Sequence, residues 1–270
     1  MIYSLIPLLD LQKARLVFNV LLMKCCLLIP DTHIPYHDIK AYKLMLEVAK
    51  DIKIDEIYIL GDYADFYAVS SHGKDPSVAS ILIDEISSVL ECLNELDANF
   101  KNVKKFYLQG NHEWRLERYL NDQAAALFGI TSTEHLLEIN RRVNWKFIGY
   151  GPNQSIKVGD SFLTARHEPL ASSAKATAAK ALCSLTYGHI HRIEESHIVG
   201  LDGINHVCFS VGWLGDKRQD KIYGYVKSHH QWQLGFGIVY VDPKTKYFYH
   251  QKIHIMNNYT CVVNGKSYKA

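Results

Sequence analysis

The stretch KCCLLIPDTH, residues 24–33, joins a continuous apolar run to the polar triplet Asp31-Thr32-His33. A short run without alternation is typical of a strand buried on both faces. The arrangement recurs twice: the stretch 56–60 stops at Gly61-Asp62, and the stretch 104–108 is followed by a Gly-Asn-His turn. The sequence therefore predicts three buried strands with polar side chains just past their carboxyl ends, where open α/β sheets bind ligands.

Two amphipathic segments separate these strands. Apolar residues recur close to every 3.6 positions in residues 38–53 and again in residues 77–96, which predicts two helices. This strand–helix order indicates an α/β half with a largely parallel sheet. From Trp145 onward we expect short strands, with hairpin turns at residues 242–245 and 264–265. Residues 23–270 are therefore expected to form a single α/β (α+β) domain, with two packed mixed β-sheets flanked by helices.

The composition is that of an ordinary globular protein, with 48% hydrophobic and 21% charged residues among 270. A formal net charge of +2 neither requires nor excludes a nucleic-acid partner, and it leaves the oligomeric state open. No stretch reaches the roughly 18 uninterrupted apolar residues of a membrane span, so no membrane partner is expected. The six cysteines include no C-x-x-C pair and most lie in apolar runs, which favours core packing in a reducing cytoplasm.

Residues 1–22 form an N-terminal extension of uncertain status. Polar residues such as Asp10, Lys13 and Arg15 interrupt its apolar character. It has neither a basic n-region nor a small-residue cleavage site, so a signal peptide is not expected. Two interpretations stay open: a segment that packs on the domain, and an upstream start codon that is seldom used. Function is not expected to depend on it.

Five fragments with metal-ligand side chains fall at the ends of predicted strands: Asp31-Thr32-His33, Gly61-Asp62-Tyr63-Ala64-Asp65, Gly110-Asn111-His112-Glu113, Arg166-His167-Glu168 and Gly188-His189-Ile190-His191. Taken singly each is weak, because a lone histidine is more often a hydrogen-bonded polar residue than a ligand. Together, carboxylates, an amide oxygen and imidazole nitrogens form a donor set suited to Mn, Fe, Zn or Ni. The glycines at 61, 110 and 188 permit the tight turns that bring such side chains together.

The ordered set D-x-H, G-D-x-x-D, G-N-H-E, a lone His and G-H-x-H is similar to the signature of the calcineurin-like metallophosphoesterase superfamily, in particular its stand-alone bacterial and phage members. The resemblance runs from Asp31 to His191. It implies a four-layer sandwich and two divalent metal ions, with Mn²⁺ the first expectation and Fe, Zn or Ni as alternatives. The implied ligands are Asp31, His33 and His191 for the first metal, Asn111, His167 and His189 for the second, and Asp62 as the bridge.

The shared ligand has a physical reason. Two dications about 3.5–4 Å apart repel each other, and a bridging carboxylate offsets part of that repulsion while fixing their separation. The resemblance further implies that a metal-bridging hydroxide attacks phosphorus in line, opposite the leaving oxygen.

Two further residues receive catalytic roles from the resemblance. His112 follows a ligand and is expected to act near the leaving group, as a general acid or transition-state stabiliser. Asp65 is expected to accept a hydrogen bond from His112 and fix its tautomer. A helix N-cap or turn role is an equally good interpretation of Asp65 from the residues alone.

The sequence departs from the family pattern at several points. Glu113 stands where Asp is usual, and His167 lacks the usual following glycine. His135 competes with His167 by composition, but it lies in an apparent helix and is expected at the surface. The usual N-P-G-S turn is replaced by Ser210-Val211-Gly212-Trp213, so its contribution to substrate binding is not carried over.

Other polar residues near the motifs have weaker claims. Arg115 and Arg118 lie on a predicted helix, residues 113–127, within reach of a substrate phosphate, yet their charge pattern favours a solvated helix face. Tyr36 and His37 fit the cleft mouth or a surface loop equally well. The aromatic and basic segment 223–249 fits a half-exposed strand pair better than a surface that stacks on single-stranded nucleic acid.

The combined pattern predicts a metal-dependent phosphoric ester hydrolase whose partner is a phosphoester, including nucleic acid. Phosphodiester or nucleic-acid cleavage is favoured over phosphomonoester cleavage, because small stand-alone members of the superfamily often cleave diesters. The alternative is a phosphomonoesterase such as a protein Ser/Thr phosphatase. Those phosphatases usually carry their phosphate-binding arginine at a position, relative to the motifs, that differs from that of Arg115. A non-catalytic scaffold is disfavoured because Asp62, Asn111 and His112 are all present.

Overall fold

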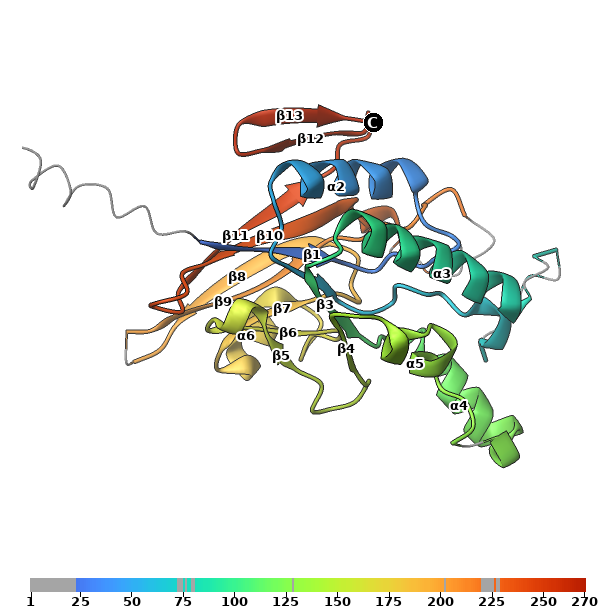
Figure 1. Ribbon diagram of the computed structural model, residues 1–270. Helices are drawn as coiled ribbons and strands as arrows, with labels where there is room; N and C mark the ends of the chain where they lie inside the picture. The colour runs from blue at the N-terminus through green and yellow to red at the C-terminus, as the bar shows by residue number, and fades with distance from the viewer. Residues whose placement is uncertain are drawn as a thin grey trace, which may run out of the picture.

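The computed structural model describes residues 23–71, 75, 77–78, 81–127, 129–201, 203–219, 226 and 229–270 (Figure 1). The predicted extension at residues 1–22 lies outside this part of the chain. Two β-sheets form the centre. The first has the order β11 (Phe248–His254), β10 (Gly235–Val241), β1 (Lys24–Ile29), β2 (Glu56–Ile59), β3 (Lys104–Leu108) and β4 (Trp145–Ile148). The second has the order β5 (Ile156–Lys157), β6 (Leu163–Arg166), β7 (Ser184–Tyr187), β9 (Asn205–Val211) and β8 (Ile193–Val199).

The described part of the chain contains five α-helices and five 3₁₀ helices. They are α2 (Ile39–Asp51), α3 (Leu82–Asn99), α4 (Trp114–Gln123), α5 (Thr133–Leu136) and α6 (Ala174–Ala181), with 3₁₀ helices at Tyr67–Val69, Ala125–Leu127, Ile139–Arg141, Val158–Asp160 and His229–Gln231. Figure 1 shows α2 and α3 across the first sheet and α6 against the second. A hairpin of β12 (Thr260–Val263) and β13 (Lys266–Lys269) packs beyond α2. No described helix is long and apolar enough to cross a membrane.

The alternation of side chains along β1 explains the layers. Leu27 and Ile29 point into the core beneath α2 and α3, whereas Cys26 and Leu28 point into the core between the two sheets. Successive strand residues face opposite sides, so a strand that is apolar at every position must be covered on both faces. The predicted fold class, two packed mixed sheets flanked by helices, is confirmed.

Both sheets are mixed, and the candidate site residues follow their parallel strands. Strands β1 to β4 run parallel to one another, whereas β10 and β11 are antiparallel additions. In the second sheet β6, β7 and β9 are parallel, with β5 and β8 antiparallel at the edges. The predicted hairpin turns are confirmed, because residues 242–245 join β10 to β11 and residues 264–265 join β12 to β13.

Some element boundaries differ from those predicted. The second helix was expected to begin near Ser77 and begins at Leu82, because Ser77 donates to the carboxylate of Asp75 in a local turn and Ile81 is extended. Residues 79–80 lie outside the described part. The helix predicted for residues 113–127 ends at Gln123, where Ala124 leaves helical geometry. In the aromatic segment, residues 223–225 are not described; β10 is almost entirely buried, and only β11 is half-exposed.

All six cysteines lie in the described part of the chain, and none forms a disulfide. Cys25, Cys26, Cys208 and Cys261 are buried, as expected for thiols that pack as small apolar side chains.

A charged cluster joins the edge strands of the two sheets. Glu195 on β8 accepts hydrogen bonds from His250 Nε2 at 2.7 Å and Lys252 Nζ at 2.7 Å, both on β11, and from His197 Nε2 at 2.8 Å. Although burial raises it, the hydrogen bonds from Lys252, His250 and His197 lower the pKa of Glu195 to about 2. The carboxylate therefore stabilises the contact between the sheets only while it is ionised.

We expect Glu195→Gln to lower the free energy of unfolding by about 1 kcal/mol at neutral pH, the upper range for partly exposed ion pairs. The folded pKa lies below the unfolded value of about 4.3, so the contribution is present above that value and is lost as the pH falls through the folded pKa. Urea unfolding should show the gap between wild type and variant narrowing to roughly half near pH 3. A gap that stays constant with pH would contradict this reading.

Candidate metal centre

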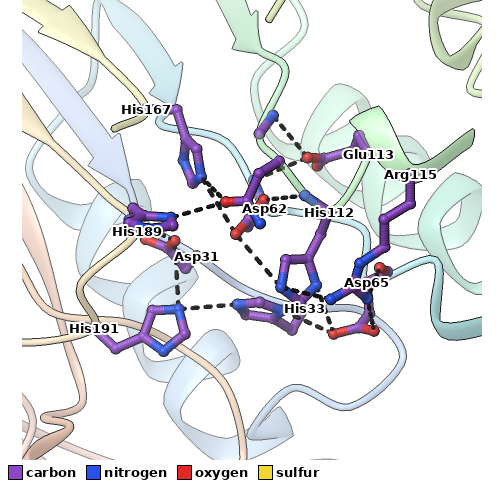
Figure 2. Close-up of polar contacts among 12 residues, drawn as sticks. Asp31, His33, Asp62, Asp65, His112, Glu113, Arg115, His167, His189 and His191 are labelled. Atoms are coloured by element: carbon purple, nitrogen blue, oxygen red, sulfur yellow. Dashed lines mark hydrogen bonds and ion pairs between the residues drawn. The ribbon is translucent and has the colours of Figure 1, made fainter. Parts of the chain in front are cut away.

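The five predicted fragments meet where strand ends of the two sheets converge (Figure 2). Asp31, Asp62 and Asn111 follow β1, β2 and β3 of the first sheet, and His167 and His189 follow β6 and β7 of the second. All five strands point their carboxyl ends at the same place. Residues separated by up to 160 positions along the chain therefore lie within hydrogen-bonding range of one another.

The residues predicted for the first metal form one buried group. Asp31, His33, Asp62 and His191 each offer one ligand atom, and these atoms lie within 4.8 Å of one another. The Nε2 atoms of His33 and His191 are 3.1 Å apart, and His191 Nε2 is 3.5 Å from Asp31 Oδ1. A cation between them would meet two imidazole nitrogens and two carboxylates.

The residues predicted for the second metal form an adjoining group that shares Asp62. Ligand atoms of Asp62, His167 and His189 lie within 4.8 Å of one another. The Asn111 Oδ1 atom is 2.9 Å from His167 Nε2 and 2.8 Å from His189 Nδ1. Asp62 is thus the one residue common to the two groups, as its predicted bridging position requires.

The orientation of His167 fits a metal better than a purely structural role. Its Nδ1 lies 2.9 Å from the carbonyl of Leu60, an obligate acceptor, so Nδ1 carries the proton and Nε2 presents its lone pair in the neutral ring. That lone pair faces the Asn111 oxygen at 2.9 Å and Asp62 Oδ2 at 3.3 Å. Such lone pairs repel unless a cation lies between them. The carbonyl of Leu60 orients the ring as partners of metal-bound histidines do.

The charges of the site call for a positive ion. Asp31 and Asp62 are buried, and Asp31 Oδ2 has no hydrogen-bond partner among the described residues. Burial raises the pKa of the Asp62 carboxyl, but the charges of His167 and His112 hold it well below its usual range. In return, although burial lowers it, Asp62 raises the pKa of His167 to about 10. Without a metal, the negative charge of these carboxylates holds a proton on His167. A divalent cation would balance the same negative charge.

The backbone is strained at four of the predicted ligands. His33, Asp62, His189 and His191 have φ values of 55°, 48°, 68° and 57°, in the left-handed region that non-glycine residues rarely adopt. Each such residue costs on the order of 1–3 kcal/mol, and such residues concentrate at functional sites. Close packing against neighbouring side chains also explains why glycine stands at positions 61 and 188. A Cβ at Gly61 would lie 2.4 Å from His167 Nδ1, and one at Gly188 would lie 2.5 Å from Asp31 Oδ2.

Glu113 has a role that the sequence did not reveal. Its carboxylate accepts hydrogen bonds from the backbone N–H groups of Asp62, Tyr63, Ala64 and Gly110 and from the Tyr107 hydroxyl, at 2.7–3.0 Å. It thereby holds the Asp62 loop against the Asn111 loop. The available signal was the acidic side chain of Glu113 directly after the G-N-H motif, where Asp is usual.

We expect Glu113→Gln to destabilise the fold and weaken metal binding together. Glu113 Oε2 accepts from Asp62 N–H and Gly110 N–H, and an amide NH₂ in its place would face two donors. Leaving buried donors unpaired costs about 1–3 kcal/mol each, so a loss of about 3 kcal/mol is expected in urea unfolding. Glu47→Gln, on the exposed face of α2, is the matched control and should change neither quantity.

Three charged or polar side chains contact the Asp65 carboxylate. Its Oδ2 is 2.9 Å from His33 Nδ1 and 3.1 Å from His112 Nδ1, and its Oδ1 accepts from Arg115 Nη1 at 3.1 Å. The predicted hydrogen bond to His112 is therefore present. The alternative helix N-cap role is wrong, because Phe66 is the N-cap of the helix Tyr67–Val69 and no side chain caps it.

Arg115 corrects a sequence-based prediction. It was expected on a solvated helix face, but it is buried. Its guanidinium donates to the Asp65 carbonyl at 3.0 Å and to His112 Nε2 at 3.0 Å. Arg118 is exposed, as expected. The available signal was spacing: Arg115 lies three residues after His112, on the same side of the chain as it enters α4.

His33, Asp65 and His112 form a third group with ligand atoms within 4.8 Å. Here both Nδ1 atoms are engaged with Asp65, and the adjacent Arg115 already supplies the positive charge. A metal is therefore disfavoured in this group, and His112 lies beside the metal cluster without belonging to it.

The remaining predictions have definite places. His135 is exposed, as expected, and belongs to neither ligand group. Tyr36 packs against Tyr67, with ring centroids 6.1 Å apart, whereas the His37 ring packs on Tyr42. In the segment that replaces the N-P-G-S turn, Trp213 stacks on the His191 ring at 4.9 Å. This departure from the family pattern therefore supports a predicted ligand.

Comparison with known proteins found several similar chains. The Gene 54 protein of Mycobacterium phage D29 is 27% identical over 238 residues, which span 81% of this chain and 89% of the phage protein. Among solved structures, the YfcE phosphoesterase of E. coli is 15% identical, with 84% of this chain and 98% of that chain covered and a TM-score of 0.37. Vacuolar protein sorting 29 of Cryptosporidium parvum is 14% identical, with 91% and 94% covered and a TM-score of 0.41.

A family match also spans most of the chain. The sequence pattern of the calcineurin-like phosphoesterases matches residues 26–265, which include every strand end that carries a predicted ligand. Matched over nearly its whole described length and carrying a buried Asp/His cluster able to hold metal, the chain belongs to the calcineurin-like phosphoesterase family.

Proposed function

We propose that this chain is a binuclear metal-dependent phosphoesterase that hydrolyses phosphodiesters, including nucleic acid. The observation that carries the proposal is the pair of adjoining ligand groups that share Asp62. Asp31, His33 and His191 would hold one cation, and Asn111, His167 and His189 the other. When bound, the two cations polarise the phosphoryl oxygens and lower the pKa of a water molecule so that it can attack phosphorus. Mn²⁺ is the ion proposed first, with Fe, Zn and Ni as alternatives, because nitrogen and oxygen donors suit all four.

His112 and Arg115 are proposed to act at the leaving oxygen. His112 Nδ1–H donates to Asp65, which leaves Nε2 as the acceptor of the Arg115 N–H. Burial lowers the pKa of His112, so the ring is neutral at neutral pH. Its Nε2 lies 3.9 Å from Asp62 Oδ2, close to the shared ligand. In this arrangement His112 has no free N–H, so the donor that can stabilise charge on a departing alkoxide is the Arg115 guanidinium, which the His112 ring positions beside the cluster.

The state of Arg115 favours a diester over a monoester. A phosphomonoester dianion is best held by a guanidinium that is free to make two parallel hydrogen bonds. Arg115 lies beside the cluster, and its Nη1 and Nη2 groups already bind the Asp65 carbonyl, the Asp65 carboxylate and His112. The singly charged phosphate of a diester needs less cationic charge from the protein.

The proposal is tested by rates on four substrates, with Mn²⁺ added to chelator-treated protein: bis(p-nitrophenyl) phosphate, p-nitrophenyl phosphate, and single- and double-stranded DNA. We expect the aryl diester to be hydrolysed faster than the aryl monoester, with no turnover before Mn²⁺ is added. A faster monoester reaction would point to a phosphomonoesterase. Two bound Mn²⁺ with no turnover of any substrate would point to a scaffold.

Arg115→Met is expected to slow turnover by about 10- to 100-fold, because losing a hydrogen-bonded charged partner costs roughly 1.5–3 kcal/mol. Metal content should be unchanged, since Arg115 contacts Asp65 and His112 and not the two ligand groups. Arg118→Met, on the exposed face of the same helix, is the matched control and should retain wild-type kinetics. Equal rates for the two variants would show that Arg115 is structural only.

A further inference from the structure

A pocket of about 530 Å³ opens beside the second ligand group, lined by Glu168, Leu170, His189, Ile190, Arg192 and Trp232, among others. We call it the His189 pocket. His189 belongs to both the pocket and the ligand group, because its Nδ1 lies 2.8 Å from Asn111 Oδ1. The pocket therefore adjoins the second ligand group through His189.

The pocket lies on the wrong side of the cluster to hold the leaving group. Figure 2 shows His189 and His112 on opposite sides of Asp62. A donor to the leaving oxygen must be within hydrogen-bonding reach of it, so the leaving group belongs on the side of His112 and Arg115. Because the His189 pocket lies away from that side (Figure 2), the ester group that can enter it is the one retained on phosphorus.

The leaving group and the retained group also differ chemically during hydrolysis. Water loses a proton and its oxygen bonds to phosphorus, the bond from phosphorus to the leaving oxygen breaks, and that oxygen takes up a proton. The bond to the retained group stays intact. A monoester has no retained group, and it would leave the pocket without an occupant.

The lining suits a ring-bearing alcohol. Leu170, Ile190 and Trp232 supply apolar surface against which a flat ring can pack. Arg192 supplies the polar contact. Its guanidinium is part-exposed, its contacts with Gln231 Oε1 at 3.3 Å and Ser172 O at 3.4 Å are longer than typical hydrogen bonds, and its ion pair with Glu194 Oε2 spans 3.6 Å. Donors on Arg192 can therefore turn to sugar or phosphate oxygens of a bound group.

We propose that the His189 pocket binds the retained nucleoside of a phosphodiester, with Arg192 donating to its oxygens. This rests on the proposed phosphodiesterase function. It narrows the substrate class to nucleotide-type diesters and makes Arg192 a specificity-determining residue.

The test uses the full chain loaded with Mn²⁺ and three esters with the same p-nitrophenolate leaving group. They are thymidine 5′-(p-nitrophenyl phosphate), methyl p-nitrophenyl phosphate and p-nitrophenyl phosphate. Because the leaving group is constant, differences in kcat/KM between the two diesters report on the retained group. We expect the thymidine ester to be preferred over the methyl ester by about tenfold or more, with the difference mainly in KM.

Two variants then assign the preference to the pocket. Arg192→Ala should reduce the ratio of thymidine to methyl ester at least threefold, and Ala171→Trp, which fills the pocket from its wall, should reduce it further. Arg118→Ala, an exposed arginine on α4, should leave the ratio unchanged.

The possible failures are distinguishable. Hydrolysis of both diesters with equal kcat/KM, or a ratio that Arg192→Ala and Ala171→Trp leave unchanged, overturns the pocket assignment alone. Hydrolysis of neither diester by protein with two bound Mn²⁺ overturns the proposed function and the pocket assignment together, and so does a faster reaction with p-nitrophenyl phosphate.

Discussion

Asp62→Asn is expected to abolish phosphoester hydrolysis and to reduce bound metal from two ions per chain to one or none. Asp62 is the residue common to both ligand groups, and its carboxylate is buried. Removing that charge leaves two cations repelling each other at about 3.5–4 Å without a shared anion. The measurements are metal content after gel filtration and the rate on bis(p-nitrophenyl) phosphate.

The fold should survive this change. Asp62 Oδ1 accepts the His112 backbone N–H at 2.8 Å, and the amide oxygen of Asn can keep that bond. The circular dichroism spectrum and unfolding midpoint should therefore stay close to those of wild type. Asp122→Asn, an exposed carboxylate on α4, controls for the charge change. Wild-type activity in Asp62→Asn would remove the basis of the two-metal proposal.

The second large effect is expected from His112→Asn, a loss of about 10²–10⁴-fold in kcat with metal content unchanged. His112 contacts Asp65 and Arg115, which hold its ring in place, while the metal ligands come from neighbouring positions. Removing it takes away the group proposed to act at the leaving oxygen and leaves both ligand groups intact.

The leaving group separates this role from a structural one. A donor at the leaving oxygen matters most for poor leaving groups, so the loss should be larger for an alkyl ester or DNA than for a p-nitrophenyl ester. An equal loss on all substrates would indicate that His112 acts through the shape of the site. Loss of bound metal in His112→Asn would show that it is a ligand.

Local pattern was sufficient for the first three strands and for the residues that the structure gathers into the two groups able to hold metal. The apolar run 24–29 predicted β1, and the polar triplet after it supplied Asp31 and His33, which lie in the first ligand group. Strand ends are a local property of the chain, and parallel strands bring their carboxyl ends to one edge, so side chains that follow them converge. The elements that were missed lack such a pattern. The strand β8 has charged residues in its middle, and α6 consists mainly of alanine and lysine.

Only the tertiary structure decided the roles of Arg115, Glu113 and Arg192. In the sequence, an arginine among other charged residues on a helix looks the same whether its N–H groups donate to water or to Asp65. The same holds for Glu113, whose hydrogen-bond donors come mainly from a loop about 50 positions earlier. The residues that can bind metal were thus determined by the sequence itself. Which charges are buried beside them, and which pocket opens next to them, depended on how the two sheets pack, because burial is set by contacts between distant parts of the chain.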